Sequence, residues 1–431
     1  MAANPNTIPL QTVWTREYQD THAKIPVYPA ITNYRLKGKL EKGNIVKRTY
    51  ARQFVANDMG GGGEFSRQTI VDTEETLTIN KEKETSFYIK DLDKLQSHLP
   101  TQERYARGAT MALHQQIDAD VLAEYANMTN SLDNASFGGS SGDGITVSSS
   151  NVTQIFSNVS RLLQRANIMV NASAKFTGVK LDDMQYDSLG VAVISPEVYA
   201  SIIERLDGKN SQLGDKVGVQ GQCGTYMGYN LFVSNALTWT GTFSMVTQPT
   251  DGDTVTIGGV TFTFKTTLGS TAGNVLIGGS ADVARANLAN LINNPSTTDS
   301  NGVALGTTPD ANGFSDQDKM KNLTATNSNS LDTMTLVAKG KGHVVVSDTC
   351  TAVADGWTSG LQIQHCLIGV ANAIDLVLQK EPTMDTRKRD GYVGSDVVTW
   401  CVYGIKTFND GKPKLVDVKV NTSAYSGSTT Y

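Results

Sequence analysis

One long helical pattern, residues 101–127, constrains the fold of this sequence more than any other feature. It reads TQERYARGATMALHQQIDADVLAEYAN, and its apolar residues recur about every four positions, as one face of an α-helix requires. The residues of this stripe are Tyr105, Ala109, Leu113, Ile117 and Val121. Pro100 closes the preceding segment, Thr101 can cap the helix, and Gly108 is its one weak helix former. At about 1.5 Å per residue the helix would be roughly 40 Å long, so it needs a long surface to pack against.

The preceding segment, Arg35 to Asp91, predicts a long β-hairpin. Its first half, RLKGKLEKGNIVKRTYARQFV, is basic and partly alternating, and its second half, FSRQTIVDTEETLTINKEKETSFYI, has the composition of a strand. The glycine run 60–63 between them indicates a turn at the tip, and without a GxxxxGK[ST] pattern it is not a phosphate loop. A two-stranded ribbon is marginal in water by itself. With few large apolar residues for a core of its own, it is expected to lie on another molecule.

The charges of this hairpin predict how it meets that molecule. Its first half carries Lys37, Lys39, Lys42, Lys47, Arg48 and Arg52, and its second half carries Asp72, Glu74 and Glu75. Exposed ion pairs contribute little affinity one by one. We therefore expect these charges to set the register with that molecule, with buried apolar area supplying the affinity.

The remaining parts of the chain outside residues 244–356 predict a mixed α and β body. Residues 151–166 form an amphipathic helix, and the buried strand 191–194 runs into Ser195-Pro196-Glu197, a helix start. Residues 221–235 read as a turn followed by a strand, and residues 361–378 are apolar. Two alternating segments at 397–408 and 414–420 flank Asp410-Gly411 and predict a terminal hairpin.

Residues 244–356 differ in composition, being rich in Thr, Asn and Gly. Two alternating segments around Gly258-Gly259 predict a hairpin, Ser280 can cap a helix over residues 281–293, and strand patterns follow at 322–326, 334–338 and 343–346. The block has apolar residues for a small core: Val255, Ile257, Phe262, Phe264, Leu288, Leu291, Ile292 and Val344 to Val346. It is long enough to fold alone. We expect an autonomous module inserted in a parent domain and displayed on a surface.

Composition excludes several classes of protein. The chain has 431 residues, 39% of them hydrophobic, and a net charge of -5, so it can bury sizeable cores and needs no polyanionic partner. No signal peptide and no apolar run long enough to cross a membrane is visible. Cys223, Cys350, Cys366 and Cys401 show no CxxC spacing, which predicts free buried thiols in a cytoplasmic product.

No catalytic, cofactor-binding or metal-ligating constellation is visible, since HExxH, GxSxG and nucleotide-binding patterns are missing. Among the five histidines, we expect His114 to be solvated on the polar side of the long helix and His365 to be a hydrogen-bonded core residue. Asp182 and Asp183 are adjacent, and adjacent carboxylates seldom converge on one ion. The run at 387–390 is read as a solvated turn, with an acidic neighbour or DNA as the alternative.

The order of these elements resembles the major capsid proteins of tailed bacteriophages, the Hong Kong 97 fold. Three motifs carry the resemblance: VAVISPEVY at 191–199, GYNLFVSN at 228–235, and YGIK at 403–406. It covers residues 1–243 and 357–431, and the block at 244–356 is the departure from a minimal member of the family.

The resemblance implies an α+β fold of Hong Kong 97 type with a small α+β insertion domain, and a division of the chain into seven segments that form six parts. These are an N-terminal arm (1–34), an extended hairpin loop (35–91), a peripheral domain with a spine helix (92–150), an axial domain (151–243 and 357–396), the inserted β-rich domain (244–356), and closing peripheral strands with the tail (397–431).

The resemblance also implies a structural protein that is not an enzyme and needs no cofactor. It would assemble with itself as pentamers and hexamers into an icosahedral shell around double-stranded DNA, made in the host cytoplasm and located in the virion. Scaffolding, portal and decoration proteins, and non-specific contact with packaged DNA, are the other implied partners, with no membrane. Two alternatives stay open: an encapsulin-type compartment shell, and a β-rich tail or adhesion component.

Overall fold

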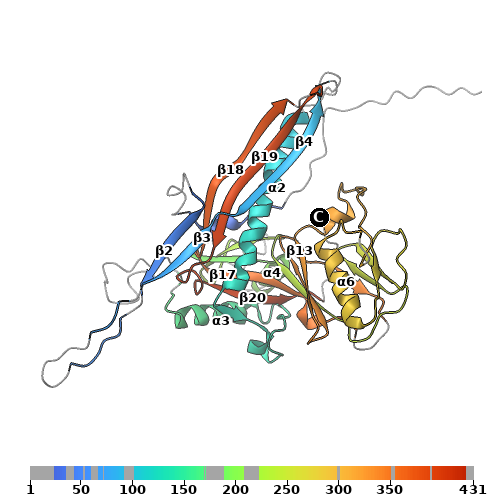
Figure 1. The fold of residues 1–431 in the computed structure, drawn as a ribbon. Coiled ribbons are helices and arrows are strands. Elements are labelled where there is room, and N and C mark those ends of the chain that lie inside the picture. The colour runs from blue at the N-terminus through green and yellow to red at the C-terminus, as the bar shows by residue number, and fades with distance from the viewer. Residues whose placement is uncertain are drawn as a thin grey trace, which may run out of the picture.

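A computed structural model gives the structure of the protein (Figure 1). It describes residues 24–34, 43–51, 54–59, 67–70, 72–91, 101–168, 170, 189–207, 223–298, 301–350, 355–388 and 391–423. Part of the predicted N-terminal arm and hairpin, the glycine run 60–63 and Asp182 and Asp183 therefore lie outside the described residues.

The predicted long helix is confirmed. Helix α2 spans Thr101–Leu122 and continues as the 3-10 helix η2, Ala123–Asn127. Its predicted apolar stripe is buried from Ala109 onward, whereas Tyr105 is 56% exposed. The arm lies against this helix, because the buried Asp118 carboxylate accepts hydrogen bonds from the main-chain N–H groups of Val27 (2.9 Å) and Tyr28 (2.7 Å). Burial raises the pKa of Asp118 to about 6, which these two bonds oppose.

A four-stranded sheet supplies the long surface that α2 requires (Figure 1). Its order is β1 (Thr32–Asn33), β18 (Ile374–Lys388), β19 (Gly394–Lys406) and β4 (Lys81–Lys90). The helix and sheet meet at Asp120, whose carboxylate accepts a hydrogen bond from the Tyr403 hydroxyl at 2.7 Å and pairs with the Lys81 ammonium at 3.1 Å. Alternate residues of β19, such as Tyr403 and Cys401, are buried on the helix side.

The predicted hairpin forms only in part. Strands β2 (Ile45–Ala51) and β3 (Asp72–Thr78) pair antiparallel as a separate two-stranded sheet, the ribbon, which projects from the body (Figure 1). The predicted second strand, however, divides after Thr78, and β4 joins β19 instead. The physical reason is that Leu77 and Ile79 are buried against the body, so the chain leaves the ribbon at this point.

The body is built on a ten-stranded sheet with the order β13-β14-β9-β17-β6-β8-β7, to which β5, β16 and β20 add. Six of its strands belong to the body: β5 (Asn130–Leu132), β6 (Gly190–Ile194), β7 (Thr225–Tyr226), β8 (Tyr229–Val233), β17 (Ile363–Val370) and β20 (Leu415–Asn421). The other four belong to a second lobe, described below. The sheet is accompanied by helices α3 (Val152–Arg165) and α4 (Pro196–Leu206) and by the short helices η1 (Tyr28–Ala30), η3 (Asn134–Phe137) and η4 (Ser359–Leu361). As predicted, Ser195 caps α4 by accepting a hydrogen bond from the Val198 N–H.

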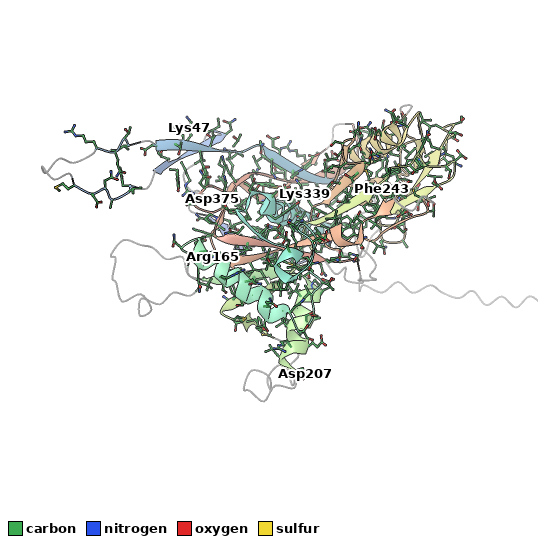
Figure 2. All side chains as sticks on the ribbon, turned by 90° about the horizontal axis from the view of Figure 1, so that it is seen from below. Lys47, Arg165, Asp207, Phe243, Lys339 and Asp375 are labelled. Atoms are coloured by element: carbon green, nitrogen blue, oxygen red, sulfur yellow. The ribbon has the colours of Figure 1, made fainter. Side chains whose placement is uncertain are left out.

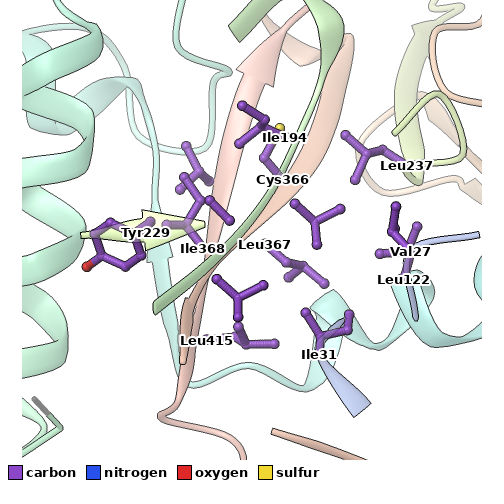
Figure 3. Packing of buried hydrophobic residues seen from close by; sticks show 14 of the residues in the cluster. Val27, Ile31, Leu122, Ile194, Tyr229, Leu237, Cys366, Leu367, Ile368 and Leu415 are labelled. Atoms are coloured by element: carbon purple, nitrogen blue, oxygen red, sulfur yellow. The ribbon is translucent and has the colours of Figure 1, made fainter. Parts of the chain in front are cut away.

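Strand β17 is buried along its whole length, and its sequence is apolar except for Gln364 and His365. Figure 3 shows Ile368 on the side of Tyr229, and Leu367 on the side of Ile31 and Leu122. The first hydrophobic cluster therefore packs against both faces of this strand.

The predicted terminal hairpin is wrong. Strand β19 pairs with β18 and β4, whereas β20 pairs with β17 and β5 in the other sheet. The turn itself is present, since Gly411 N–H donates to the Phe408 carbonyl at 2.9 Å. Phe408, which is 1% exposed, is buried in a cluster with Leu77, Ile79 and Val377 of β18. The turn that follows it carries the chain from the four-stranded sheet of β19 to the ten-stranded sheet of β20.

A second lobe has its own hydrophobic cluster (Figure 1, right). It contains four strands of the ten-stranded sheet: β9 (Trp239–Ser244), β13 (Leu323–Ser328), β14 (Thr333–Ala338) and β16 (Gly356–Trp357). It also contains a separate four-stranded sheet with the order β12 (Asn274–Leu276), β11 (Val260–Lys265), β10 (Thr254–Ile257) and β15 (Val346–Asp348). Two helices, α6 (Ala281–Asn293) and α7 (Asp316–Lys319), complete the lobe. The hairpin at Gly258 and Gly259 is confirmed, with φ of 54° and 79°. The strand predicted at 343–346 begins only at Val346.

We predict that Tyr403→Phe lowers the free energy of unfolding by about 1–3 kcal/mol, because it leaves the buried Asp120 carboxylate without one hydrogen bond while keeping the ring. Denaturant unfolding followed by circular dichroism measures the change. Tyr392→Phe is the control, since Tyr392 is 61% exposed and should change little. Equal effects of the two substitutions would contradict the assigned contact.

Candidate interaction surfaces

The base of the ribbon is fixed to its own body by a small apolar cluster. It contains Val46, Leu77 and Ile79 from the ribbon side, and Val377 and Phe408 from the body. We expected the whole hairpin to lie on another molecule. This expectation is wrong for the base of the ribbon, which packs against its own body. Buried apolar area of this kind holds the ribbon at one angle to the body.

An ion-pair cluster reinforces the same base. The Arg48 guanidinium contacts the carboxylates of Asp375 at 2.9 Å and Asp410 at 2.8 Å, and lies 4.7 Å from the ring centroid of Phe408. Burial raises the pKa of Asp375 to about 6, and the Arg48 charge opposes that rise. Glu75 adds a contact by accepting a hydrogen bond from the Asn409 N–H at 3.0 Å.

The predicted complementary charges are thus largely engaged within the chain. Lys47 pairs with Glu74 across the ribbon at 2.8 Å, and Arg48 and Glu75 contact the body. Figure 2 shows Lys47 on the projecting ribbon and Asp375 in the body. Lys37, Lys39, Lys42 and Arg52 lie outside the described residues.

The described segments beyond the two strands, residues 54–59 and 67–70, which we call the outer ribbon, have the opposite character, because their large apolar side chains are exposed. Phe54 and Val55 are each 67% exposed, Met59 is 71% exposed, and Ile70 is 74% exposed. The two sides are joined where the Gln68 side chain accepts a hydrogen bond from the Val55 N–H at 3.1 Å. Single exposed apolar residues are ordinary on a surface, but a group on a projecting segment is typical of an interaction site.

A second candidate surface is the face of the four-stranded sheet that α2 leaves uncovered. The residues of β19 that alternate with its buried ones, Val398, Trp400 and Val402, form a partly exposed row there. Trp400 donates a hydrogen bond to Asp385 at 3.0 Å, and the Lys380 ammonium lies 3.9 Å from its ring centroid. A cavity of about 480 Å³ at this face is also lined by Glu82, Glu84 and Arg387. An apolar centre with a charged border is the usual composition of a protein interface.

The predicted role of His365 is confirmed: it is a buried residue whose hydrogen bonds are satisfied. Its Nδ1 lies 2.9 Å from Asp417 and its Nε2 lies 3.0 Å from the Thr240 hydroxyl, while its ring stacks on Tyr125 at a centroid distance of 3.7 Å. The sequence shows none of these pairings, because the three partners come from β9, β20 and η2.

Hydroxyl, imidazole and carboxylate in this order also occur in hydrolases. Here, however, Thr240 lies within a sheet, in register with Val337 on one side and Ile363 on the other, and the imidazole is covered by Tyr125. The main chain of Thr240 therefore takes part in strand pairing and is not placed to bind an oxyanion. We assign the group to holding β9, β17 and β20 together.

The other residues considered from the sequence do not form a site. His114 is not simply solvated, because its Nδ1 lies 3.0 Å from the Tyr28 hydroxyl. Arg387 and Lys388 end β18 and are exposed. Within the described ranges, no group of three His, Cys, Asp or Glu residues could hold a metal ion. The four cysteines are free, and three of them are buried as predicted, whereas Cys350 is only half-buried. No described helix is long and apolar enough to cross a membrane.

Comparison with known proteins places this geometry among phage structures. No protein-family model matches the sequence, and no curated protein matches it. The chain is similar to a solved structure from Mycobacterium phage Che8, with 15% identity over 96% of this chain and 98% of that chain and a TM-score of 0.53. It is also similar to a chain of the capsid asymmetric unit of cyanophage Pam1, with 9% identity, coverage of 98% and 99%, and a TM-score of 0.51. The chain therefore has a mixed α and β fold that occurs in phage capsids, which confirms the resemblance inferred from the sequence.

We predict that Arg48→Met increases hydrogen–deuterium exchange in β2 and β3, because it removes both ion pairs at the ribbon base and leaves the buried Asp375 carboxylate with the hydrogen bond from Asn33 and the charge of Lys414 alone. Lys47→Met is the matched control on the adjacent residue. It breaks only the exposed pair with Glu74, whose side chains are 62% and 60% exposed, so exchange should stay close to that of the unsubstituted protein. Similar exchange in both variants would show that the cluster does not fix the ribbon.

Proposed function

We propose that this chain is the major capsid protein of a tailed phage, which assembles with itself into an icosahedral shell around double-stranded DNA. The observation that carries the proposal is the ribbon: its base is fixed to the body, and its outer part exposes four large apolar side chains. The similarity to a chain of the Pam1 capsid over nearly the full length supports it.

The mechanism is association through many modest contacts. The outer ribbon of one subunit lies on a neighbour, and full burial of a Phe, Val, Met or Ile side chain contributes about 1.5–3 kcal/mol each. Because the ribbon base keeps its charges paired within the chain, apolar contact supplies the affinity, and border charges such as Glu82 and Arg387 set the register. Scaffolding, portal and decoration proteins, and non-specific contact with packaged DNA, are further proposed partners.

We assign the parts of the fold as follows. The ribbon is the extended loop, and α2 with β4, β18 and β19 is the peripheral domain. The axial domain contains β6, β8, β17, β20, α3 and α4, so the final strand belongs with it rather than with the peripheral domain. The inserted domain begins at β9, because Trp239 and Phe243 are part of the second cluster.

The test of this function is particle formation. Full-length protein produced with neighbouring phage gene products is expected to form large uniform particles in light scattering and electron microscopy, with nuclease-protected DNA when packaging proceeds. Closed particles filled with protein rather than DNA would favour an encapsulin-type compartment. Fibres or small oligomers under every condition would favour a tail or adhesion component and would contradict the proposal.

We predict that Phe54→Asp combined with Ile70→Asp abolishes particles while far-UV circular dichroism stays unchanged, because both side chains are exposed in the subunit and, on this proposal, are buried only against a neighbouring subunit. Ala56→Asp combined with Thr69→Asp is the control, with the same added charge on exposed neighbouring residues. Normal assembly of the first variant would remove the ribbon from the mechanism, and its misfolding would show that the ribbon packs internally.

The boundary of the inserted domain yields a further prediction. A fragment of residues 237–358 should melt cooperatively, whereas a fragment of residues 244–356 should be less stable by several kcal/mol, because it lacks Trp239 and Phe243 from the cluster. Differential scanning calorimetry measures both melts. Equal stability of the two fragments would place the start of the inserted domain at residue 244. If neither fragment shows a melting transition, the inserted domain is not autonomous.

A further inference from the structure

One face of three strands in the second lobe carries a regular array of hydroxyl groups. Strand β14 pairs with β13 on one side and with β9 on the other, so side chains that lie opposite one another form rows across the three strands. The nine residues of these rows, which we call the hydroxyl face, are Thr240, Thr242, Ser244, Thr324, Thr326, Ser328, Thr333, Thr335 and Val337. Eight of the nine carry a hydroxyl group, and none is charged.

The hydroxyl face is open to solvent, whereas the other face of the same strands is buried. Thr324, Thr326 and Thr335 are exposed, and the remaining six residues are half-buried. The residues that alternate with them, such as Phe243 and Leu336, belong to the second hydrophobic cluster, which also contains residues of α6 (Figure 1). The folded chain therefore presents these hydroxyl groups outward.

Most hydroxyl groups of this face are not used inside the chain. Within the described residues, five of them make no hydrogen bond to the protein: those of Thr242, Thr324, Thr326, Thr333 and Thr335. The separate four-stranded sheet of the same lobe differs, because the Thr256 and Thr261 hydroxyl groups lie 3.1 Å apart and bond to each other. A high threonine content alone therefore does not explain the unused groups of the hydroxyl face.

A cavity of about 400 Å³ lies at one border of the hydroxyl face. It is lined by Thr240, Thr335 and Val337 of the face, and by Tyr125 and Met128 from the chain that follows α2. The aromatic ring and the thioether add apolar surface beside the hydroxyl groups. The border of the face is thus concave, as binding sites for small molecules usually are.

Polar side chains of the body also line this cavity. They are Ser131, His365, Asp417 and Lys419. The imidazole of His365 is already held by Asp417 and Thr240, so these three residues give the cavity a fixed wall. Ser131 and Lys419 bring a hydroxyl and an ammonium group to the same cavity.

The chemistry of the face indicates a neutral ligand that is itself rich in hydroxyl groups. A threonine or serine hydroxyl donates one hydrogen bond and accepts others, as the hydroxyl groups of a sugar do. Phosphate and carboxylate groups are usually bound by arginine or lysine, and no position of the face carries either. An apolar partner would bury the hydroxyl groups without hydrogen bonds, which is unfavourable.

The sheet is also a poor acceptor for an added protein strand. Its free edge in this lobe is β13, where the Asn293 side chain of α6 donates to the Ala325 carbonyl at 2.9 Å and accepts from the Ala325 N–H at 2.8 Å. These are edge groups that an incoming strand would need. Recognition at this place therefore depends on the side chains of the hydroxyl face.

We propose that the hydroxyl face and its cavity bind an extended, neutral oligosaccharide. Neighbouring strands lie about 4.8 Å apart, a spacing close to the length of one pyranose unit, so an extended β-linked chain can meet several rows at once. The apolar faces of its rings would lie against the threonine methyl groups, Val337 and Tyr125. The proposal rests on the contacts of this face and does not depend on the capsid function.

The experiment measures sugar binding by the full-length, unassembled chain. Saturation-transfer difference NMR is carried out with cellohexaose, which is extended, with maltohexaose, which is helical, and with a charged hexasaccharide of hyaluronan. Cellohexaose is expected to bind saturably and more tightly than the other two, because it alone is both extended and neutral.

Substitutions show whether the hydroxyl face is the site. Thr242→Val and Thr335→Val keep the shape and the β propensity of the side chains but remove a hydroxyl group, so each should weaken cellohexaose binding about two- to tenfold. Thr256→Val combined with Thr261→Val is the matched control on the other sheet, and it should leave the binding unchanged.

Far-UV circular dichroism shows whether each variant is folded, and either single variant of the face serves if the other is not. The absence of saturable cellohexaose binding to the unsubstituted chain would overturn the proposal. So would equal binding by the variants of the face and the control, or tighter binding of the hyaluronan hexasaccharide than of cellohexaose.

Discussion

The packing of a 22-residue helix along one face of the mixed sheet β1-β18-β19-β4 is the contact on which the rest of the structure depends. Helix α2 buries its apolar stripe there, and Asp120 fixes the relative position of the two elements through Tyr403 and Lys81. A helix this long covers only one face of so narrow a sheet. The opposite face, with its Trp400 row, is left partly exposed, and the ribbon extends beyond the body. The construction of the subunit thus creates the surfaces on which neighbours can pack.

Two of the crossings between sheets meet in one cluster. One crossing follows Thr78, where β3 leaves the ribbon and β4 enters the four-stranded sheet, and the other is the turn after Phe408. Leu77 and Phe408 are buried in the same cluster, and Arg48 lies over the Phe408 ring. The angle between the ribbon and the body therefore depends on the chain at both crossings. A shift of either crossing would change the position of the projecting ribbon.

Features specified by neighbouring residues were predictable from the sequence. The bounds of α6, the cap at Ser195, the glycine turn at Gly258 and the buried strand β6 all follow local rules of capping, turn geometry and periodicity. The resemblance carried by three short motifs was also sufficient to infer the fold, although only 9% to 15% of residues are identical in the two solved structures compared.

Features that depend on distant residues were not predictable in this way. Alternation shows that residues 397–408 and 414–420 are strands, but not that they pair with β18 and β17 instead of each other. Nor does a basic first half of a hairpin reveal that Arg48 contacts Asp375, 327 positions away. The group of Thr240, His365 and Asp417 likewise exists only because three strands are adjacent in one sheet. Long-range strand order is a property of the whole core, which no local pattern encodes.

The central claim is that the outer ribbon and the exposed face of the four-stranded sheet are contact surfaces between copies of this chain. A cryo-electron microscopy reconstruction of the assembled particle, at a resolution that shows side chains, tests it most directly. The account predicts that Phe54, Val55, Met59 and Ile70 of each copy are buried against another copy, and that Trp400 is covered. Closed particles in which these side chains remain exposed to solvent, or are covered only by their own subunit, would contradict it.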